Sequence, residues 1–236
     1  MVQGSKSVIA AIIIAIGLFL LGSRVATGLE NALGDERTVS VRGLSERIVP
    51  ADKVVWPLVY KEVGNDLQSL SIQVNNKNKI IIDYLKSKGI ADDDISVSPP
   101  EIIDLQAERY VSQNVPYRYN LRSIITVSSQ QVDLVRRLIN QQGELLDKGV
   151  AIVSGEYDAR VDYQFTGLND LKPDMIAEAT RNARQAAEQF ASDSESKLGK
   201  IKTASQGQFS ISDRDQYTPY LKNVRVVTSV VYYLED

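Results

Sequence analysis

The stretch that decides the fold, residues 38–63, reads TVSVRGLSERIVPADKVVWPLVYKEV. Apolar residues alternate with polar ones in both halves, which predicts two β-strands, at Thr38–Val49 and Lys53–Val63. One face of the second strand is expected to hold Val54, Trp56, Leu58 and Tyr60. Pro50-Ala51-Asp52 between the strands is typical of a turn, so the pair predicts a β-hairpin. Pro57 has no N–H to donate, so we expect an edge or a bulge there.

A helix is predicted after this pair, from Asn65 to about Lys88, because its apolar residues recur at spacings of three and four. Asn65 is expected to be the N-cap, with Gln68 completing a capping box. Gly89 is expected to end the helix, because glycine readily adopts the left-handed conformation found after helix ends.

A longer helix is predicted for Leu171–Leu198, with Pro173 near its first turn and Gly199 just after its end. Many of its inward positions are alanines, which suggests that the helix lies very close to a sheet. A shorter helix is expected at Gln130–Gln142.

The remaining strands are expected at Ile95–Tyr110, Tyr117–Ser128, Val153–Phe165, Lys200–Ser212 and Asn223–Leu234. The last one is apolar on both faces, which favours a position inside a sheet. The element order ββαββαβαββ favours an α+β domain spanning residues 38–236. Its sheet should be largely antiparallel, with about seven strands and with helices packed on one face.

The N-terminus carries an uncharged run, SVIAAIIIAIGLFLLGS at residues 7–23, between Lys6 and Arg24. Its length favours an N-terminal transmembrane helix or signal anchor within residues 1–26, followed by a tether at residues 27–37. A cleaved signal peptide is the alternative, although the residues up to Ala26 match a cleavage site poorly. We expect the C-terminal domain to be exported, which places it in the periplasm of a single-pass inner-membrane protein.

The composition excludes several kinds of chemistry. The chain has neither histidine nor cysteine, so a Ser-His-Asp triad, a thiolate nucleophile and a disulfide are impossible. The formal net charge of −3 offers no basic surface for nucleic acid. We expect no cofactor and no metal, and we predict no catalytic residue.

Three adjacent aspartates, Asp92, Asp93 and Asp94, are the most conspicuous acidic cluster. A calcium loop alternates its ligands and adds a distant glutamate, and neither feature is present here. A solvated turn between a helix and a strand is therefore the favoured interpretation.

Tyrosines and arginines cluster in two places and could bind a partner, although cross-strand pairing with polar tips is more common for such residues. The candidate partner-binding residues are Arg109, Tyr110, Tyr117, Arg118, Tyr119, Tyr217 and Tyr220. A further charged group, Glu178, Arg181, Arg184 and Glu188, is expected to form an exposed ladder along the long helix.

Four segments together resemble the SIMPL-domain family, also called DUF541. These are TVSVRGLSERIVPADKV, YLKSKGIADDDISVSPPEI, Tyr119-Asn120-Leu121-Arg122 and AEATRNARQAAEQFASDSESKLGKI. The chain departs from the family pattern at three positions. Ala51 separates Pro50 from Asp52, Arg118 stands where the family has glycine, and Gln185 replaces a frequent lysine.

The resemblance implies an exported bacterial envelope protein without established enzymatic activity. Some family members are linked to oxidative-stress tolerance, and some assemble into large symmetric oligomers, so the resemblance implies a homo-oligomer. We therefore expect a membrane-anchored, non-enzymatic protein that works by assembly or by partner binding. A small-molecule-binding module and a carboxylate- or tyrosine-based enzyme stay open as alternatives.

Overall fold

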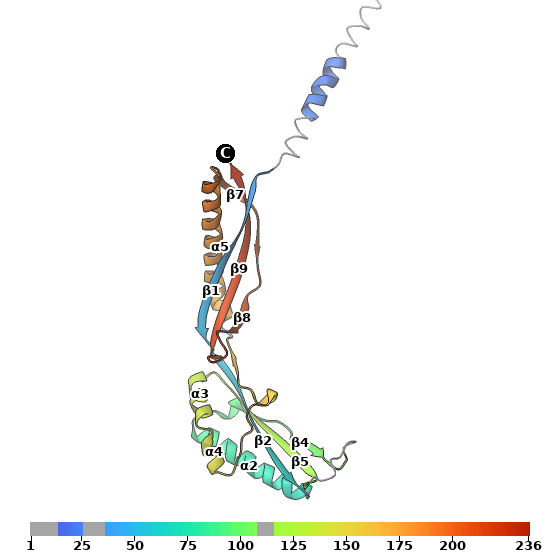
Figure 1. Ribbon diagram of the computed structural model, residues 1–236, viewed down its shortest axis with the longest axis vertical. Helices are drawn as coiled ribbons and strands as arrows, with labels where there is room; N and C mark the ends of the chain where they lie inside the picture. The colour runs from blue at the N-terminus through green and yellow to red at the C-terminus, as the bar shows by residue number, and fades with distance from the viewer. Residues whose placement is uncertain (1–13, 26–35, 108–115) are drawn as a thin grey trace, which may run out of the picture.

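The computed structural model describes residues 14–25, 36–107 and 116–236. These residues form two antiparallel sheets, which lie one after the other along the long axis of the molecule (Figure 1). We call the part built on the first sheet the proximal lobe and the part built on the second sheet the distal lobe.

The proximal lobe contains sheet A and one long helix. Sheet A is formed by β1 (Thr38–Pro50), β9 (Leu221–Glu235), β7 (Lys197–Gln206) and β8 (Ser210–Asp213). Strand β9 pairs with the other three, which confirms the prediction that the last strand is interior. Helix α5 (Leu168–Asp193) packs on one face of this sheet (Figure 1).

The distal lobe contains sheet B and three helices. Sheet B is formed by β2 (Lys53–Gly64), β5 (Tyr119–Ser129), β6 (Asp162–Gln164), β3 (Ile95–Val97) and β4 (Glu101–Asp104). The helices are α2 (Leu67–Ser87), α3 (Val132–Asn140) and α4 (Gly143–Asp147), and two short 3-10 turns lie at Asp92–Asp94 and Tyr157–Ala159. Strands β3 and β4 both pair with the same edge of β5.

The predicted hairpin between the first two strands is wrong. Strand β1 pairs with β9 along its whole length, whereas β2 pairs with β5 and β6 in the other sheet. The two residues between them bond elsewhere, because Ala51 N–H donates to Tyr220 and Asp52 N–H donates to Gln164. The chain therefore passes directly from one sheet into the other, and an alternating pattern cannot show which strand pairs with which.

The expected single sheet of about seven strands is also wrong in detail. The described residues form nine strands in two sheets, although the α+β class and the antiparallel pairing are confirmed. The predicted strand at Ile95–Tyr110 is divided into β3 and β4 by Ser98-Pro99-Pro100, where the prolines supply no N–H for pairing. The predicted strand at Val153–Phe165 shortens to β6 and a single bridge from Val153 to Val59.

Pro57 lies where the sequence predicts. Strand β6 pairs only with residues Lys53–Val55 of β2, and Val59 accepts from Val153 on the same side. Positions 55, 57 and 59 of β2 face the same edge of the strand. The N–H that Pro57 lacks would therefore point at the part of this edge that lies between β6 and Val153 and has no pairing partner among the described residues.

Helix α2 begins one residue later than expected. Asp66 is the N-cap and accepts from Ser69 N–H at 2.7 Å, whereas Asn65 accepts from the backbone N–H of Arg118. The predicted end at Gly89 is confirmed by a φ of 97° there. Ile90 N–H donates back to Leu85 and the Ile90 side chain is buried, so the end is a Schellman motif.

Helix α5 lies very close to β1, as its alanines suggest. The residues buried against the sheet are Met175, Ala179, Ala183, Ala187 and Ala191. A Cβ atom at Gly43 of β1 would lie 1.8 Å from the Ala179 carbonyl oxygen, so the helix contacts the bare backbone there. The predicted end at Gly199 is wrong, because the helix stops at Asp193 and Glu195 adopts the left-handed conformation.

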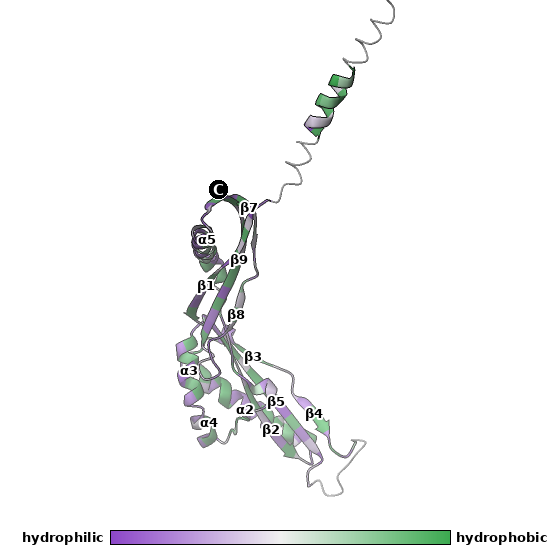
Figure 2. Cartoon of the chain, turned by 45° about the horizontal axis from the view of Figure 1, so that its top comes forward, coloured by the Kyte–Doolittle hydropathy of each residue, from purple (hydrophilic) through white to green (hydrophobic). Residues whose placement is uncertain are grey.

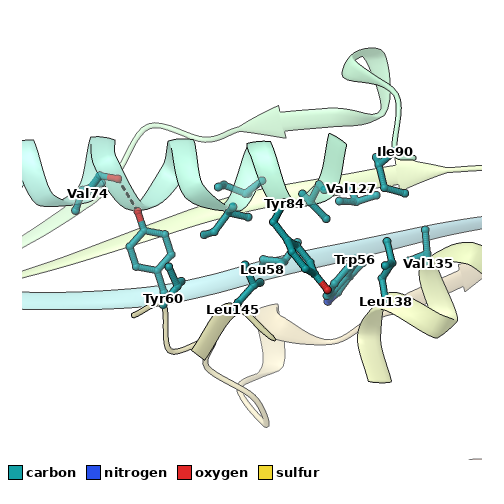
Figure 3. Packing of buried hydrophobic residues seen from close by; sticks show 14 of the residues in the cluster. Trp56, Leu58, Tyr60, Val74, Tyr84, Ile90, Val127, Val135, Leu138 and Leu145 are labelled. Carbon is teal, nitrogen blue, oxygen red and sulfur yellow. Dashed lines mark hydrogen bonds between the residues drawn. The ribbon is translucent and has the colours of Figure 1, made fainter. Parts of the chain in front are cut away.

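The core of the distal lobe lies between sheet B and its helices (Figure 3). The predicted face of the second strand, Val54, Trp56, Leu58 and Tyr60, is buried in it. The Tyr60 hydroxyl donates to the Val74 carbonyl oxygen at 2.9 Å, which joins β2 to α2. Burial raises the pKa of Tyr60, so this hydroxyl stays protonated.

The predicted membrane segment is only partly described. Residues 7–13 lie outside the described residues, and residues 14–25 form a short, largely apolar helix (Figure 2). Within the described parts of the chain, no helix combines the length and hydropathy of a membrane span. The transmembrane helix therefore stays a prediction.

Candidate functional site

Exposed apolar side chains gather where α2 begins and β4 runs. We define the distal tip as Val63, Leu67, Ile72, Ile102, Ile103 and Tyr117, each of which exposes at least two fifths of its surface. Strand β4 lies at the outer edge of sheet B, beyond β5 (Figure 2). Exposed apolar clusters of this kind mark interaction sites more often than single exposed residues do.

A groove of about 490 Å³ opens between α2 and β4. It is lined by Leu67, Gln68, Ser71, Val74, Asn75, Pro100, Ile102 and Leu121. Leu121 of β5 is buried, whereas Ile102, directly opposite it on β4, is 52% exposed. No charged side chain is among the lining residues, and Gln68, Ser71 and Asn75 provide uncharged hydrogen-bonding groups.

The local sequence explains why the groove is open. The run Ser98-Pro99-Pro100 interrupts the edge of the sheet between β3 and β4. Helix α2 contacts β2 and β5 more extensively than any other strand. The face of β4 that carries Ile102 therefore lies beside α2 and is not covered by it.

The outer edge of β4 carries unpaired backbone groups. Leu105 N–H donates to the Arg118 carbonyl, so the odd-numbered residues of β4 direct their backbone groups toward β5 and the even-numbered ones direct theirs away from it. The N–H and C=O of Ile102 and the N–H of Asp104 therefore point away from β5. Among the described residues, no strand pairs with this edge.

The outer edges of the longer strands β1 and β7 differ from that of β4. On β1, the Asn182 side chain of α5 donates to the Leu44 carbonyl at 2.8 Å. Strand β7 carries Lys197, Lys200 and Lys202, and charged edges of this kind discourage pairing. Strand β4 instead presents an isoleucine on each of its faces, Ile102 toward α2 and Ile103 on the opposite side.

The face of sheet B opposite α2 also contributes to the distal tip. Val63 and Ile103 flank Asn120 in register on this face. The side-chain oxygen of Asn120 is buried and accepts no hydrogen bond within the described structure. An unsatisfied buried acceptor of this kind is costly.

An ion-pair cluster lies beside this face. Arg122 is close to three carboxylates, Glu101 at 3.2 Å, Glu156 at 3.8 Å and Asp158. Lys61 also pairs with Glu156, at 2.5 Å. The cluster holds the segment containing Glu156 and Asp158 against the sheet, so its groups serve the fold.

The predicted Tyr/Arg group at the start of β5 is divided by the structure. Tyr117 is exposed, Tyr119 packs against the core, and the Arg118 guanidinium lies 4.9 Å from the Tyr119 ring. Arg118 also binds Asp104 through two of its nitrogens, and this bond lowers the pKa of the Asp104 carboxyl. Arg109 and Tyr110 lie outside the described residues.

The second predicted group lies at the other end of sheet B. Tyr217 is exposed in the loop between β8 and β9, whereas Tyr220 packs edge-on against Tyr163 and beneath Arg136, whose Cζ is 3.4 Å from the ring centre. Tyr163 pairs with Val54 near the start of β2, and Tyr119 pairs with Gly64 at its end. The structure therefore does not bring the two predicted groups together.

The predicted acidic cluster at Asp92–Asp94 and the loop residue Asp215 both lie between regular elements. Asp92 and Asp93 are exposed in a 3-10 turn, and Asp92 pairs with Lys86, which confirms the expected solvated turn. Asp215 orders the β8–β9 loop by accepting from the backbone N–H groups of Tyr217 and Thr218. Hydrogen bonds from Thr218 and Arg214 lower the pKa of its carboxyl. Within residues 14–25, 36–107 and 116–236, no group of three acidic side chains is placed to hold a metal ion.

Sequence reasoning missed the role of Asp52. Its carboxylate accepts from Thr166 N–H at 2.8 Å and from Gly167 N–H at 2.9 Å, directly before α5. Gly167 has no side chain to cap that helix, so Asp52 supplies the negative charge that its N-terminus favours. The Pro-x-Asp motif was visible in the sequence, but its partner lies more than a hundred residues away.

Together, the two lobes and the distal tip define an α+β protein with an open sheet edge and an uncharged groove. The chain belongs to the SIMPL family, described as a protein of unknown function (DUF541), whose model matches residues 39–230. The match spans both lobes and confirms the resemblance. A comparison with curated proteins found no match.

Proposed function

We propose that this protein is a non-enzymatic component of the cell envelope that works by associating with a protein partner or with further copies of itself. The distal tip is the observation that supports this proposal most directly. Its exposed isoleucines adjoin a sheet edge that no described strand pairs with, and apolar surface next to such an edge favours association.

The charged groups near the distal tip support binding in preference to catalysis. Asp104 and Glu101 are engaged by Arg118 and Arg122, and the Arg118 bond lowers the Asp104 pKa. A general acid at neutral pH needs a raised pKa instead. The absence of histidine from the whole chain removes the side chain most often used for proton transfer.

The location is part of the same proposal. The uncharged run at residues 7–23 supports a membrane anchor, and the family resemblance supports an exported domain and a role in envelope or oxidative-stress tolerance. In this arrangement the anchor keeps the domain at the membrane surface.

Native mass spectrometry of the full chain, extracted from membranes with a mild detergent, tests the proposal. We expect a complex heavier than one 26.1 kDa chain, and its mass would give the number of copies and any partner. An Ile103→Lys variant should weaken the complex, whereas Ile48→Lys, the same change at a more exposed isoleucine on β1, should leave it intact. Single chains at high concentration would contradict the proposal.

A further inference from the structure

We infer that the groove between α2 and β4 binds an extended peptide segment of a partner protein, which adds to the edge of β4 as a new strand. The segment would carry large apolar side chains at alternate positions and no charge at those positions. This inference rests on the proposed function, in which the protein acts by association, and it names the kind of partner that the distal tip recognises.

The backbone of β4 supports an extended ligand. Ile102 offers an outward N–H and C=O, and Asp104 offers an outward N–H. The Asp104 carbonyl is already used, because it accepts from Ala107 N–H in the following turn. Three outward groups on the alternate residues Ile102 and Asp104 match the hydrogen-bonding period of a β-strand.

The side chains of β4 place that strand beside the groove. Ile102 faces the same side of the sheet as Leu121, and this is the side that α2 covers. A strand added next to β4 would lie about 4.8 Å away, with every second side chain on that same side. Those side chains can enter the groove between Ile102 and Leu67.

The charges around the groove define the ligand further. The lining residues are uncharged, and the acidic side chains of β4, Glu101 and Asp104, are paired with Arg122 and Arg118. A charged side chain entering the groove would lose its hydration without gaining an opposite charge, which is costly. Gln68, Ser71 and Asn75 can instead bond the polar groups of a neutral peptide.

Fluorescence anisotropy with the full chain in detergent tests this inference. The probe is a fluorescein-labelled nonapeptide that alternates leucine with threonine and carries one lysine at each end. We expect saturable binding, and hydrogen exchange should slow at the amides of Ile102 and Asp104. Unchanged exchange at both amides would overturn strand addition.

Two methylated peptides sharpen the test. In a strand, alternate residues direct their N–H groups to opposite edges, so N-methylation of the leucines blocks one edge and N-methylation of the threonines blocks the other. One peptide should bind normally and the other roughly tenfold more weakly or worse, because its backbone bonds are lost. Equal affinity of the two peptides would contradict the inference.

Two variants and a matched control locate the site. Ser71→Trp and Gln68→Trp fill the groove from the exposed face of α2, so each should reduce peptide affinity roughly tenfold or more. Gln73→Trp makes the same change at an exposed position of α2 that lies outside both the groove lining and the distal tip, and it should leave the affinity unchanged. Circular dichroism confirms that each variant is folded.

The uncharged dye N-phenyl-1-naphthylamine distinguishes a peptide site from a small-molecule site. We expect the peptide to displace any dye that binds in the groove. Dye binding that Ser71→Trp abolishes, without any peptide binding, would assign the groove to small apolar molecules and overturn the inference. A native complex that persists in that case would leave the proposed function standing.

Discussion

Glu178 shows how much a single residue depends on its tertiary surroundings. The sequence places it in an exposed charge ladder on the long helix, and one step of that ladder, Arg184 to Glu188, is present at 2.9 Å. Glu178 instead reaches across to β1, where it accepts from the Ser45 hydroxyl at 2.9 Å and from Arg47 at 3.3 Å. Helical spacing reports neighbours on one helix only, so it could not show this contact.

The Glu178 contact predicts a dependence of stability on pH. The Ser45 and Arg47 hydrogen bonds lower the pKa of Glu178 below its ordinary value of 4.5. A carboxyl whose pKa is lower in the folded state stabilises the fold above pH 4.5, and this contribution is lost as the pH falls through the folded-state pKa.

Thermal melting between pH 3 and pH 7 checks this prediction. The wild type should lose more stability on acidification than Glu178→Gln, which has no charge to lose. Glu188→Gln is the control, because Glu188 pairs within α5 and should leave the wild-type slope largely unchanged. Parallel curves for the wild type and Glu178→Gln would refute the assignment.

At the scale of elements, α5 packs directly against the backbone of β1 in the proximal lobe. The alanines of α5 predict such a contact, because small side chains allow backbones to approach. They do not identify the strand, and Gly43 acquires its importance only from its position beneath Ala179 and Ala183. A sequence that contains fourteen glycines gives no local sign that this one is indispensable.

Substitution of Gly43 measures that contact. Gly43→Ala places a methyl group against the helix backbone, so we expect the free energy of unfolding to fall by roughly 1–3 kcal/mol, as overpacked cores show. Chemical denaturation gives the value. Gly143→Ala is the matched control, because a Cβ there meets no atom within 4 Å, and it should change stability by less than about 1 kcal/mol.

Of the helix ends at Gly89 and Glu195, one could be predicted from the sequence and the other could not. The stop at Gly89 could be predicted, because glycine at a helix end has a local conformational cause. The stop at Glu195 could not, since this residue tolerates the left-handed conformation only at a cost that the surrounding structure offsets.

For the whole molecule, Asp52 is one of the residues that join the two lobes. Its backbone N–H bonds Gln164 in the distal lobe, and its carboxylate holds the backbone at Thr166 and Gly167 before α5 of the proximal lobe. Tyr220 adds a packed contact with Tyr163 and Arg136 nearby. The chain crosses between the lobes twice, and these contacts hold the two crossing segments together.

Removal of the Asp52 carboxylate should loosen this junction. We expect Asp52→Ala to lower the free energy of unfolding by roughly 1–3 kcal/mol, because bonds between a carboxylate and backbone N–H groups are lost. Hydrogen exchange should accelerate at Thr166 and Gly167. Asp193→Ala, which removes an aspartate bonded to Gln189 within α5, should not affect these amides.

The sequence by itself determined the α+β class, the family, most helices and strands and the absence of histidine and cysteine chemistry. The family follows from the resemblance of four segments, and the other features follow from local periodicity, from residues at helix ends or from composition. Only the tertiary structure decided that β1 and β2 belong to different sheets, that Asp52 joins the lobes and that Ile102 and Leu121 form one groove with α2. Those features depend on which distant strands pair, and alternating apolar residues are compatible with many pairings.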